Sequence, residues 1–317
     1  MSNIQSYINY IGDPRARRSI RSIYNSIEED IAAVSYYPNP SGAQDYFVDL
    51  NVSASGNGKS WGKAFKTIAA AITASNTSIG LAGNRWWARR NRIFVLGDVI
   101  TESLTVLPEK CDIIGLGTDL MPYPRVFGNH TIAVAKVGCR LINMGFVTTG
   151  TGDLWVIPAD CHGFQMVGCY MQPGTTSTKA VEITDSAHVR FLNNRITVGA
   201  GSMSVIFGVG ISIEGTAAIH DTVIQGNHIT ATAGIVVANG TLMGSLIADN
   251  YIRSTAKCIN DASADCQVIN NVMISDASAD GSGNDNVMVV STALAAGNRV
   301  TSSDHLNAPF PIQGTLA

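Results

Sequence analysis

Acidic side chains are the first candidates for chemistry in this sequence, because hydrolysis of a glycosidic bond needs two carboxylates about 5 to 10 Å apart. Five of them lie in or near short β-branched segments in the middle of the chain: Asp153, Asp160, Glu182, Asp185 and Glu214. Only Glu182 occupies the centre of such a segment, and none of the five forms a series with an arginine at equivalent positions. We therefore expect no catalytic residues and predict that the protein is not an enzyme.

Histidines would be the natural ligands of a bound metal ion. His162, His188 and His220 precede predicted strands without cysteine or acidic partners at ligand spacing. His130 and His228 each follow a Gly-Asn pair, and His228 is expected to form a hydrogen bond at a bend. The sequence predicts no metal site and no cofactor.

Two loops imitate ligand-binding motifs. The run Gly56-Asn57-Gly58-Lys59-Ser60 resembles a phosphate-binding loop, but Ser53 stands where that motif requires its first glycine. The segment 276–285 carries Asp276, Asp280 and Asp285, which could hold Ca²⁺. Their spacing matches no calcium motif, so a flexible acidic loop is the favoured interpretation and the calcium question stays open.

Composition limits the class of protein. Of 317 residues, 45% are hydrophobic and only 14% are charged, with a net charge of −3. A disordered chain needs the opposite balance, with many charged and few apolar residues. The sequence also contains no run of about 18 apolar residues, which is the length that a membrane-spanning helix needs. The slight negative charge argues against a nucleic-acid partner. The N-terminus lacks the layout of a secretion signal, so we expect assembly in the cytoplasm with the six cysteines reduced.

A repeated segment organises the chain from residue 111 onward. One position recurs at intervals of 21 to 33 residues, in the order Gly117, Gly145, Cys169, Asn194, Asn227, Asn250, Asn271 and Asn298. Short β-branched strands between Gly/Asn/Asp turns, repeated at this period, indicate a solenoid of parallel strands. We predict that the asparagines stack in a tight bend, where they adopt the left-handed conformation and pair their amides. Cys111 and Cys139 fall at equivalent positions and are expected to stack in the core.

The segment before the repeats carries a resemblance to a known family. Tyr46-Phe47-Val48-Asp49 is followed by a Gly/Ser stretch, by Ser60-Trp61 and by Ala64-Phe65-Lys66-Thr67-Ile68. This order resembles the first strand and capping helix of right-handed parallel β-helix proteins of the pectate-lyase-like superfamily. The resemblance implies an all-β fold: a right-handed, single-stranded parallel β-helix of about eight coils, capped by a helix from about Phe65 to Ala74. The paired-aspartate, Gly-His-Gly and Arg-x-Pro motifs of its hydrolases and lyases are absent here.

The N-terminal residues form a separate segment with helical periodicity. A second predicted helix follows Asp13-Pro14 and combines an apolar face with arginines near its start. These residues are Ile20, Ile23, Ile27, Ile31, Arg15, Arg17, Arg18 and Arg21. They could pack on their own domain or dock on a neighbouring subunit. We therefore divide the chain into an arm and linker (1–40), a first strand with its capping segment (41–110) and a β-helix (111–317).

Two further groups are candidates for protein contacts. The run 85–92 sets arginines around two tryptophans, which suits an interface better than a nucleic acid: Arg85, Trp86, Trp87, Arg89, Arg90 and Arg92. If Val181 and Ile183 point inward, then Val156, Val236 and Ile259 point outward and form an apolar column that another subunit would cover. A shift of one residue in this assignment would reverse the argument.

Similarity to β-helix proteins that are not exported suggests a role. Such proteins resemble bacteriophage tailspikes, fibres and capsid decoration proteins, which commonly form homotrimers. We expect a non-enzymatic virion protein, most simply a trimeric decoration or cement protein held on the shell by its N-terminal arm. The alternative is a tailspike or fibre that binds or degrades a host surface polysaccharide.

Overall fold

The computed structural model describes most of the chain from Gly42 onward. The described residues are 42–96, 99–117, 124–199, 205–216, 219–238, 242–261, 263, 265–275, 288–290, 294–302 and 310–311. The chain divides into two compact units, Met1–Ala43 and Gln44–Ala317, and only the second is described below. The predicted N-terminal arm, with its isoleucines and arginines between 15 and 31, lies outside the described residues, as does the acidic loop 276–285.

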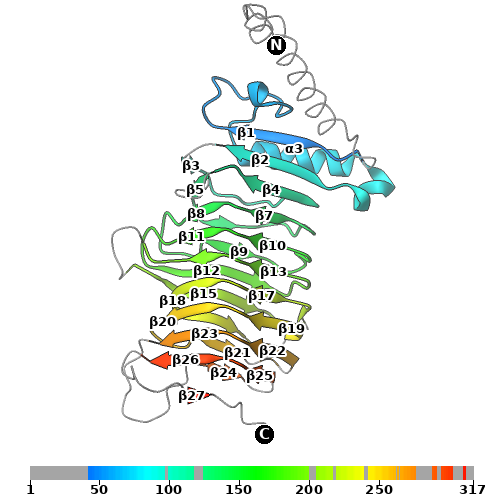
Figure 1. Ribbon diagram of the computed structural model, residues 1–317. Coiled ribbons are helices and arrows are strands. Elements are labelled where there is room, and N and C mark those ends of the chain that lie inside the picture. The colour runs from blue at the N-terminus through cyan, green and yellow to red at the C-terminus, as the bar shows by residue number, and fades with distance from the viewer. Residues whose placement is uncertain are drawn as a thin grey trace, which may run out of the picture. The chain divides into compact units, whose positions relative to one another are not determined.

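The second unit is all-β and is built from two long sheets, which confirms the predicted fold class at this level. Sheet A runs in the order β1-β2-β4-β7-β10-β13-β17-β19-β22-β25, with β16 paired to β19. Its strands are β1 (Asp45–Asp49), β2 (Asn91–Leu96), β4 (Cys111–Gly115), β7 (Arg140–Ile142), β10 (Gln165–Val167), β13 (Arg190–Leu192), β16 (Ile219–His220), β17 (Val223–Gln225), β19 (Leu242–Ala248), β22 (Asp265–Ile269) and β25 (Leu294–Ala296). Neighbouring strands are parallel and come from successive passages of the chain (Figure 1).

Sheet B holds the other strands and forms two connected rows. The first row is β3 (Val99–Thr101), β5 (Arg125–Phe127), β8 (Gly145–Val147), β11 (Tyr170–Gln172), β14 (Arg195–Ile196), β18 (His228–Val237), β20 (Tyr251–Ser254), β23 (Val272–Ser275), β26 (Arg299–Ser302) and β27 (Phe310–Pro311). The second row is β6 (His130–Thr131), β9 (Trp155–Ile157), β12 (Ser177–Thr184), β15 (Phe207–Glu214), the C-terminal half of β18, β21 (Ile259–Asp261) and β24 (Met288–Val290). Apart from the antiparallel β26–β27 pair, the described pairings are parallel.

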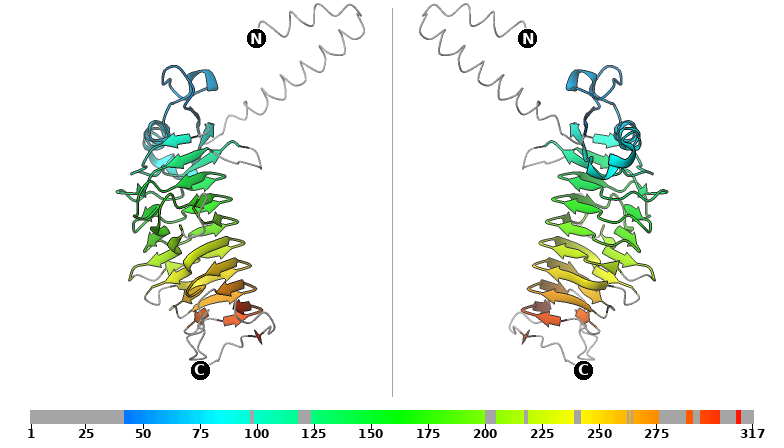
Figure 2. Two further views of the ribbon diagram at one scale, coloured as in Figure 1. Left: turned by 90° about the vertical axis from the view of Figure 1, so that its left-hand side faces the viewer. Right: turned by 90° about the vertical axis from the view of Figure 1, so that its right-hand side faces the viewer.

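Each circuit of the chain, called a coil below, adds strands to both sheets and stacks on the coil before it (Figure 2). Alternate side chains point into the stack, as expected for strands with one buried face. In sheet A the inward residues align in register and are all buried: Ile93, Ile113, Leu141, Met166, Phe191, Ile224, Ile247 and Val268. This arrangement is that expected for a parallel β-helix.

The predicted asparagine ladder is present, and its amides pair as expected. Asn194, Asn227, Asn250, Asn271 and Asn298 are each at most 7% exposed. Each Oδ1 from Asn227 onward accepts two hydrogen bonds from the preceding asparagine, one from the backbone N–H and one from Nδ2, at 2.9 to 3.0 Å. These buried polar groups are therefore satisfied along the stack.

The predicted left-handed conformation belongs to the residue before each ladder asparagine. Positive φ angles occur at Asn193, Gly226, Asp249, Asn270 and Gly297, between 54° and 68°. Glycine, asparagine and aspartate tolerate this region best, which accounts for the residue types at these positions. The expectation that the ladder residues themselves adopt it is wrong by one residue.

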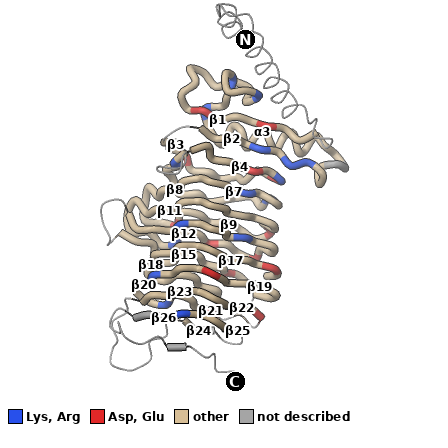
Figure 3. The backbone as a smooth tube through the Cα atoms, viewed as in Figure 1, with Lys and Arg blue, Asp and Glu red and all other residues tan. Residues whose placement is uncertain are grey.

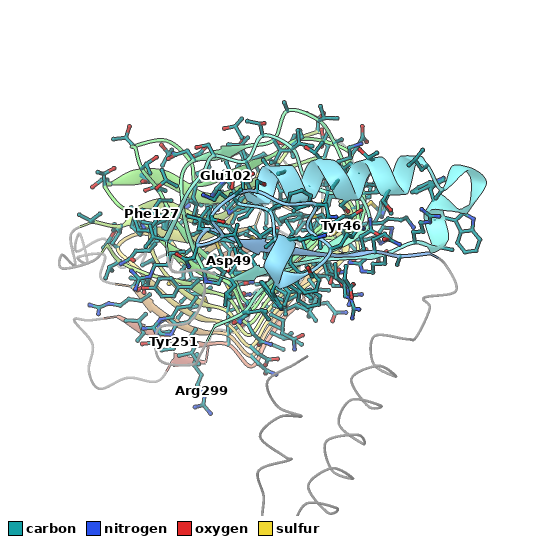
Figure 4. All side chains as sticks on the ribbon, turned by 90° about the horizontal axis from the view of Figure 1, so that it is seen from above. Tyr46, Asp49, Glu102, Phe127, Tyr251 and Arg299 are labelled. Atoms are coloured by element: carbon teal, nitrogen blue, oxygen red, sulfur yellow. The ribbon has the colours of Figure 1, made fainter. Side chains whose placement is uncertain are left out.

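The helix α3 (Ile68–Gly80) packs its buried face, which includes Ile72 and Ile79, beside β1 and β2. Thr67 is its extended N-cap, so the helix begins three residues later than predicted, and it continues six residues beyond Ala74 to Gly80. Both Glu102 carboxylate oxygens accept hydrogen bonds from the first turn, from the N–H groups of Ile68 and Ala69 (Figure 4). A carboxylate at a helix N-terminus also complements the helix dipole.

Sheet A continues across residue 110, because it includes β1 and β2 and because β2 pairs directly with β4. All six cysteines are buried as thiols. Cys111 and Cys139 lie at equivalent positions of adjacent strands, as predicted, and burial raises the pKa of Cys111 to about 12.

Candidate functional site

The tryptophan corner, Trp86 and Trp87, lies in the 3-10 helix η2 (Gly83–Ala88) between α3 and β2. Trp86 is 39% exposed and Trp87 is 67% exposed. Lys110, in the turn just before β4, holds the corner, because its Nζ donates to the Trp87 carbonyl oxygen at 2.8 Å and lies 4.9 Å from the Trp86 ring centroid. The structure therefore presents two aromatic rings at the surface on a fixed backbone.

The arginines of the predicted basic run have partners within the chain. Arg92 forms two hydrogen bonds with Asp45, at 2.7 and 2.8 Å. Arg90 Nε donates to Asp112 at 2.8 Å, and Arg89 donates to the Ser78 carbonyl oxygen at the end of α3. The Arg85 side chain lies outside the described residues. The corner is therefore less basic than its sequence suggests, and an interface there would depend on the two tryptophans.

The column predicted to face outward from sheet B is only partly apolar. Register aligns Val156, Glu182, Ser212, Val236 and Asn260. Val181 and Ile183 are buried, as predicted, and Val156 and Val236 are partly exposed.

Ile259 does not belong to this outward column. It pairs with Ile235, is fully buried, and leaves Asn260 as the outward residue of its coil. The prediction for Ile259 is therefore wrong by one position. The reason is that Cys258, one residue earlier, is also buried, so the in-out alternation is interrupted there.

A carboxylate cluster, formed by Asp153, Glu182 and Glu214 with Lys179 between them, lies on this same face. The Lys179 Nζ donates to Glu182 and to Glu214 from two adjacent coils. Ser212 Oγ donates to Glu214 Oε1 at 2.9 Å. The sequence pointed to the three carboxylates separately but did not bring them together.

The two ends of the cluster differ in proton affinity. Burial, reinforced by the negative charge of Glu182, raises the pKa of Asp153. The hydrogen bond from Lys179 outweighs desolvation and lowers the pKa of Glu214. Carboxyl groups with divergent pKa values are what acid–base chemistry requires, so this cluster is the strongest candidate for chemistry in the described part of the chain.

A continuous apolar stripe runs down the outer face of sheet A. Phe47, Phe94, Ile114, Ile142, Val167 and Leu192 align in register across six successive strands, each partly exposed. Phe47 and Phe94 stack with ring centroids 5.6 Å apart, and Trp61 packs edge-on against Phe47 at 4.8 Å. This stripe was not predicted from the sequence, although the alternation of side chains within the repeats contained the signal.

An ion-pair ladder lies beside the stripe, two residues earlier in each strand. Asp45, Arg92, Asp112 and Arg140 alternate in sign along adjacent strands (Figure 3). Arg140 holds both Asp112 oxygens, with Nε at 2.6 Å and Nη2 at 2.5 Å. Burial of Asp112 is outweighed by the hydrogen bonds from Arg140 and Arg90, which lower its pKa. The charges alternate from Asp45 to Arg140, but Arg90 and Arg190, which continues the same column two strands further along, leave the flank with more arginines than carboxylates.

A third outward column, which the sequence analysis also missed, combines arginines with rings. Tyr170, Arg195, His228, Tyr251, Val272 and Arg299 align along the first row of sheet B. The His228 and Tyr251 rings lie 4.7 Å apart, and burial with the nearby Arg195 lowers the pKa of His228. Tyr251 and Arg299 lie at the periphery of the stack when it is seen along its length (Figure 4).

The remaining histidines differ from expectation in one respect. His162 lies 3.6 Å from Asp160, and His188 lies 3.2 Å from Asp221 on the next coil, so two of them do have acidic neighbours. His130 is fully buried, stacks on Trp155 at 4.3 Å and accepts a hydrogen bond at Nδ1 from the Leu104 N–H. Burial lowers the pKa of His130 to about 3. Among the described residues, no group of three or more His, Cys, Asp and Glu is placed to hold a metal ion.

Comparison of the chain with protein-family models, with curated proteins and with solved structures finds no match. Within the described residues, no helix has the length and apolar character needed to span a bilayer.

Proposed function

We propose that this chain is a structural protein of a virus particle, a right-handed parallel β-helix of about eight coils closed at one end by α3. The observation that carries the proposal is the continuous parallel stack of sheet A from β1 to β25, with its satisfied asparagine ladder. Such a stack is a stiff spacer whose length is set by the number of coils. A decoration or cement protein needs a rigid body of this kind together with a means of attachment.

Attachment is assigned to the N-terminal arm and to the tryptophan corner. The exposed Trp87 ring sits on a backbone that Lys110 holds, and the adjacent arginines are already paired. Rigid, exposed aromatic side chains are the residues that dominate protein interfaces. The partner in this proposal is another protein of the particle, with copies of the chain grouped as a homotrimer.

Labelling of intact particles tests the function directly. An antibody against the β-helix should decorate purified virus particles in electron micrographs, at regular positions on the shell. Particles that lack the protein altogether would refute the proposal. Labelling confined to the tail would show that the protein belongs to the tail of the particle and not to its shell.

A second candidate function is favoured by the carboxylate cluster. With the pKa of Asp153 raised and that of Glu214 lowered, the cluster has the asymmetry of an acid–base pair that cleaves a glycosidic bond. The arginine–aromatic column on the neighbouring row of sheet B would suit contacts with a polysaccharide. Under this second proposed function, the protein is a tailspike or fibre.

Incubation with host surface polysaccharide separates the two candidates. New reducing ends or unsaturated sugars that disappear in an Asp153→Asn variant would favour the second function. Intact polysaccharide after prolonged incubation with the folded wild-type protein would exclude it for that polysaccharide. Asn260→Asp, a partly exposed residue of the same face, provides the control substitution.

A further inference from the structure

The arginine–aromatic column on the first row of sheet B is an exposed face with a marked selection of residue types. Its outward residues from β11 to β26 are Tyr170, Arg195, His228, Tyr251, Val272 and Arg299. The strands of this row from β3 to β26 contain four arginines but no Lys, Asp or Glu. Protein interfaces are enriched in Tyr and Arg and depleted of Lys, Asp and Glu in the same way. The composition of this face is therefore that of a protein contact.

The charge of the column indicates the charge of its partner. Arg195 and Arg299 are exposed, and neither forms an ion pair with the residues that the structure describes. Figure 4 shows the Arg299 side chain extending away from the stack. The chain as a whole carries a net charge of −3, so this face is locally opposite in sign to the protein. Contact of the column with its own equivalent would bring uncompensated guanidinium groups together, whereas an acidic partner would neutralise them.

The spacing of the two unpaired arginines favours a polypeptide over a nucleic acid. Arg195 on β14 and Arg299 on β26 lie four strands apart, which corresponds to roughly 19 Å at about 4.8 Å per strand. One strand of a nucleic-acid duplex carries a phosphate about every 3.4 Å, so roughly six phosphates would face these two guanidinium groups. An extended polypeptide covers the same length with about six residues and can carry carboxylates at the two ends alone.

The hydrogen-bonding groups of the column favour carboxylates over sugar hydroxyls. Arginine only donates hydrogen bonds and an ionised carboxylate only accepts them, so the two are matched. A sugar hydroxyl also needs an acceptor, but the outward residues of the column include no carboxylate or amide oxygen. The rings of His228 and Tyr251, 4.7 Å apart, add apolar contact area between the two arginines.

We infer that the arginine–aromatic column is a docking surface for an acidic segment of another protein. Arg195 and Arg299 pair with carboxylates of that segment, and Tyr251 packs against its apolar atoms. This surface goes beyond the proposed function, which assigns attachment to the N-terminal arm and to the tryptophan corner. Labelling of particles can therefore succeed where the tests below fail, and the two failures are distinguishable.

Binding of poly-L-glutamate tests the surface in solution, because this probe presents carboxylates at every spacing. The full chain should bind the fluorescently labelled probe at low salt, and Arg195→Glu should weaken binding by about tenfold or more. The matched control is Arg190→Glu, which makes the same change of charge at an exposed arginine on β13 of the same coil. The control should bind nearly as well as the wild type. A wild type that does not bind, or equal losses in the two variants, would overturn the inference.

Chemical protection tests the same surface on the unaltered chain, where misfolding of a variant plays no part. Phenylglyoxal modifies accessible arginines, and mass spectrometry measures the rate at each position. At about ten times its dissociation constant, poly-L-glutamate should slow modification of Arg195 and Arg299 about tenfold and leave Arg190 unchanged. Equal protection of all three arginines would overturn the inference.

Two other polyanions distinguish the class of partner. Polythymidylate and polygalacturonate, used in the same experiment, should protect Arg195 and Arg299 less than poly-L-glutamate does. Protection by either polymer in the absence of protection by poly-L-glutamate would overturn the assignment to a protein. With polygalacturonate, that result would also favour the second candidate function.

Discussion

Asn227 and Asn250 stack one coil apart, and both the backbone N–H and the Nδ2 of Asn227 donate to the Oδ1 of Asn250 at 2.9 Å. Asn250 in turn donates through Nδ2 to Asn271 Oδ1 and to the Ile224 carbonyl oxygen. One buried side chain thus satisfies groups on the coils before and after it. Removing it would leave several buried donors and acceptors without partners, which is costly because water cannot reach them.

The first prediction concerns this ladder. Asn250→Ala should lower the free energy of unfolding by about 2 to 4 kcal/mol, since each buried group left unpaired costs about 1 to 3 kcal/mol. Urea denaturation followed by circular dichroism measures the change. Asn260→Ala, which removes a partly exposed asparagine on sheet B, should change the midpoint little. Equal effects of the two substitutions would mean that the ladder contributes no special stability.

The second prediction concerns pH and the buried His130. Its folded-state pKa of about 3 lies below the unfolded value of about 6.5, so the unfolded chain binds a proton that the folded chain does not. Stability is therefore full above pH 6.5 and is lost progressively as the pH falls toward 3. Between pH 7 and pH 5 the loss from this group should be about 2 kcal/mol.

His130→Asn tests that assignment, because asparagine keeps an acceptor near the Leu104 N–H but does not titrate. The variant should be less stable than the wild type at pH 7, and its midpoint should fall less on acidification. A pH profile parallel to that of the wild type would show that other groups cause the acid sensitivity.

The third prediction concerns Lys179. In Lys179→Met, Glu182 and Glu214 lose the cation between them, so their mutual repulsion should lower stability at neutral pH by about 1 kcal/mol after allowance for solvent screening. The folded pKa of Glu214 lies below its ordinary value, so the wild-type advantage exists above that ordinary value and disappears as the pH falls through the folded pKa. Thermal midpoints of the two proteins should therefore converge in acid. A difference that stays constant with pH would indicate lost packing of the lysine stem.

The fourth prediction concerns attachment to the particle. Deletion of residues 2–33 should abolish binding to the shell and leave the β-structure intact, because Gln44–Ala317 forms its own compact unit. Trp87→Ala should weaken binding with little effect on unfolding, since this ring is 67% exposed. Co-sedimentation with shells that lack the protein measures both effects. Undiminished binding of the deletion variant would refute the role of the arm.

Much of the stack could be predicted from the repeats. The recurrence of asparagines such as Asn194 and Asn227 identified parallel coils and the amide ladder, because both depend on a local pattern that repeats. The all-β unit with long parallel sheets was predictable for the same reason. The predicted start of α3 was three residues early, because Thr67 caps the helix instead of joining it.

The predictions that failed concern strands in which the alternation of inward and outward side chains is interrupted. Ala180 and Val181 are both buried, as are Cys258 and Ile259, so each strand changes phase there. The first change places Lys179 close to Glu182, which assembles the carboxylate cluster. The second explains the wrong assignment of Ile259. One local signal is a required small residue on the preceding coil, since a Cβ added to Gly234 would lie 2.3 Å from the Cys258 carbonyl oxygen.

The central claim is that this chain is a structural protein of a virus particle, built as a stack of parallel coils. A cryo-electron microscopy map of the purified particle tests it most directly. We expect density for the two-sheet stack, from β1 to β25, at regular positions on the shell. A map of the complete particle without such stacks would contradict the claim.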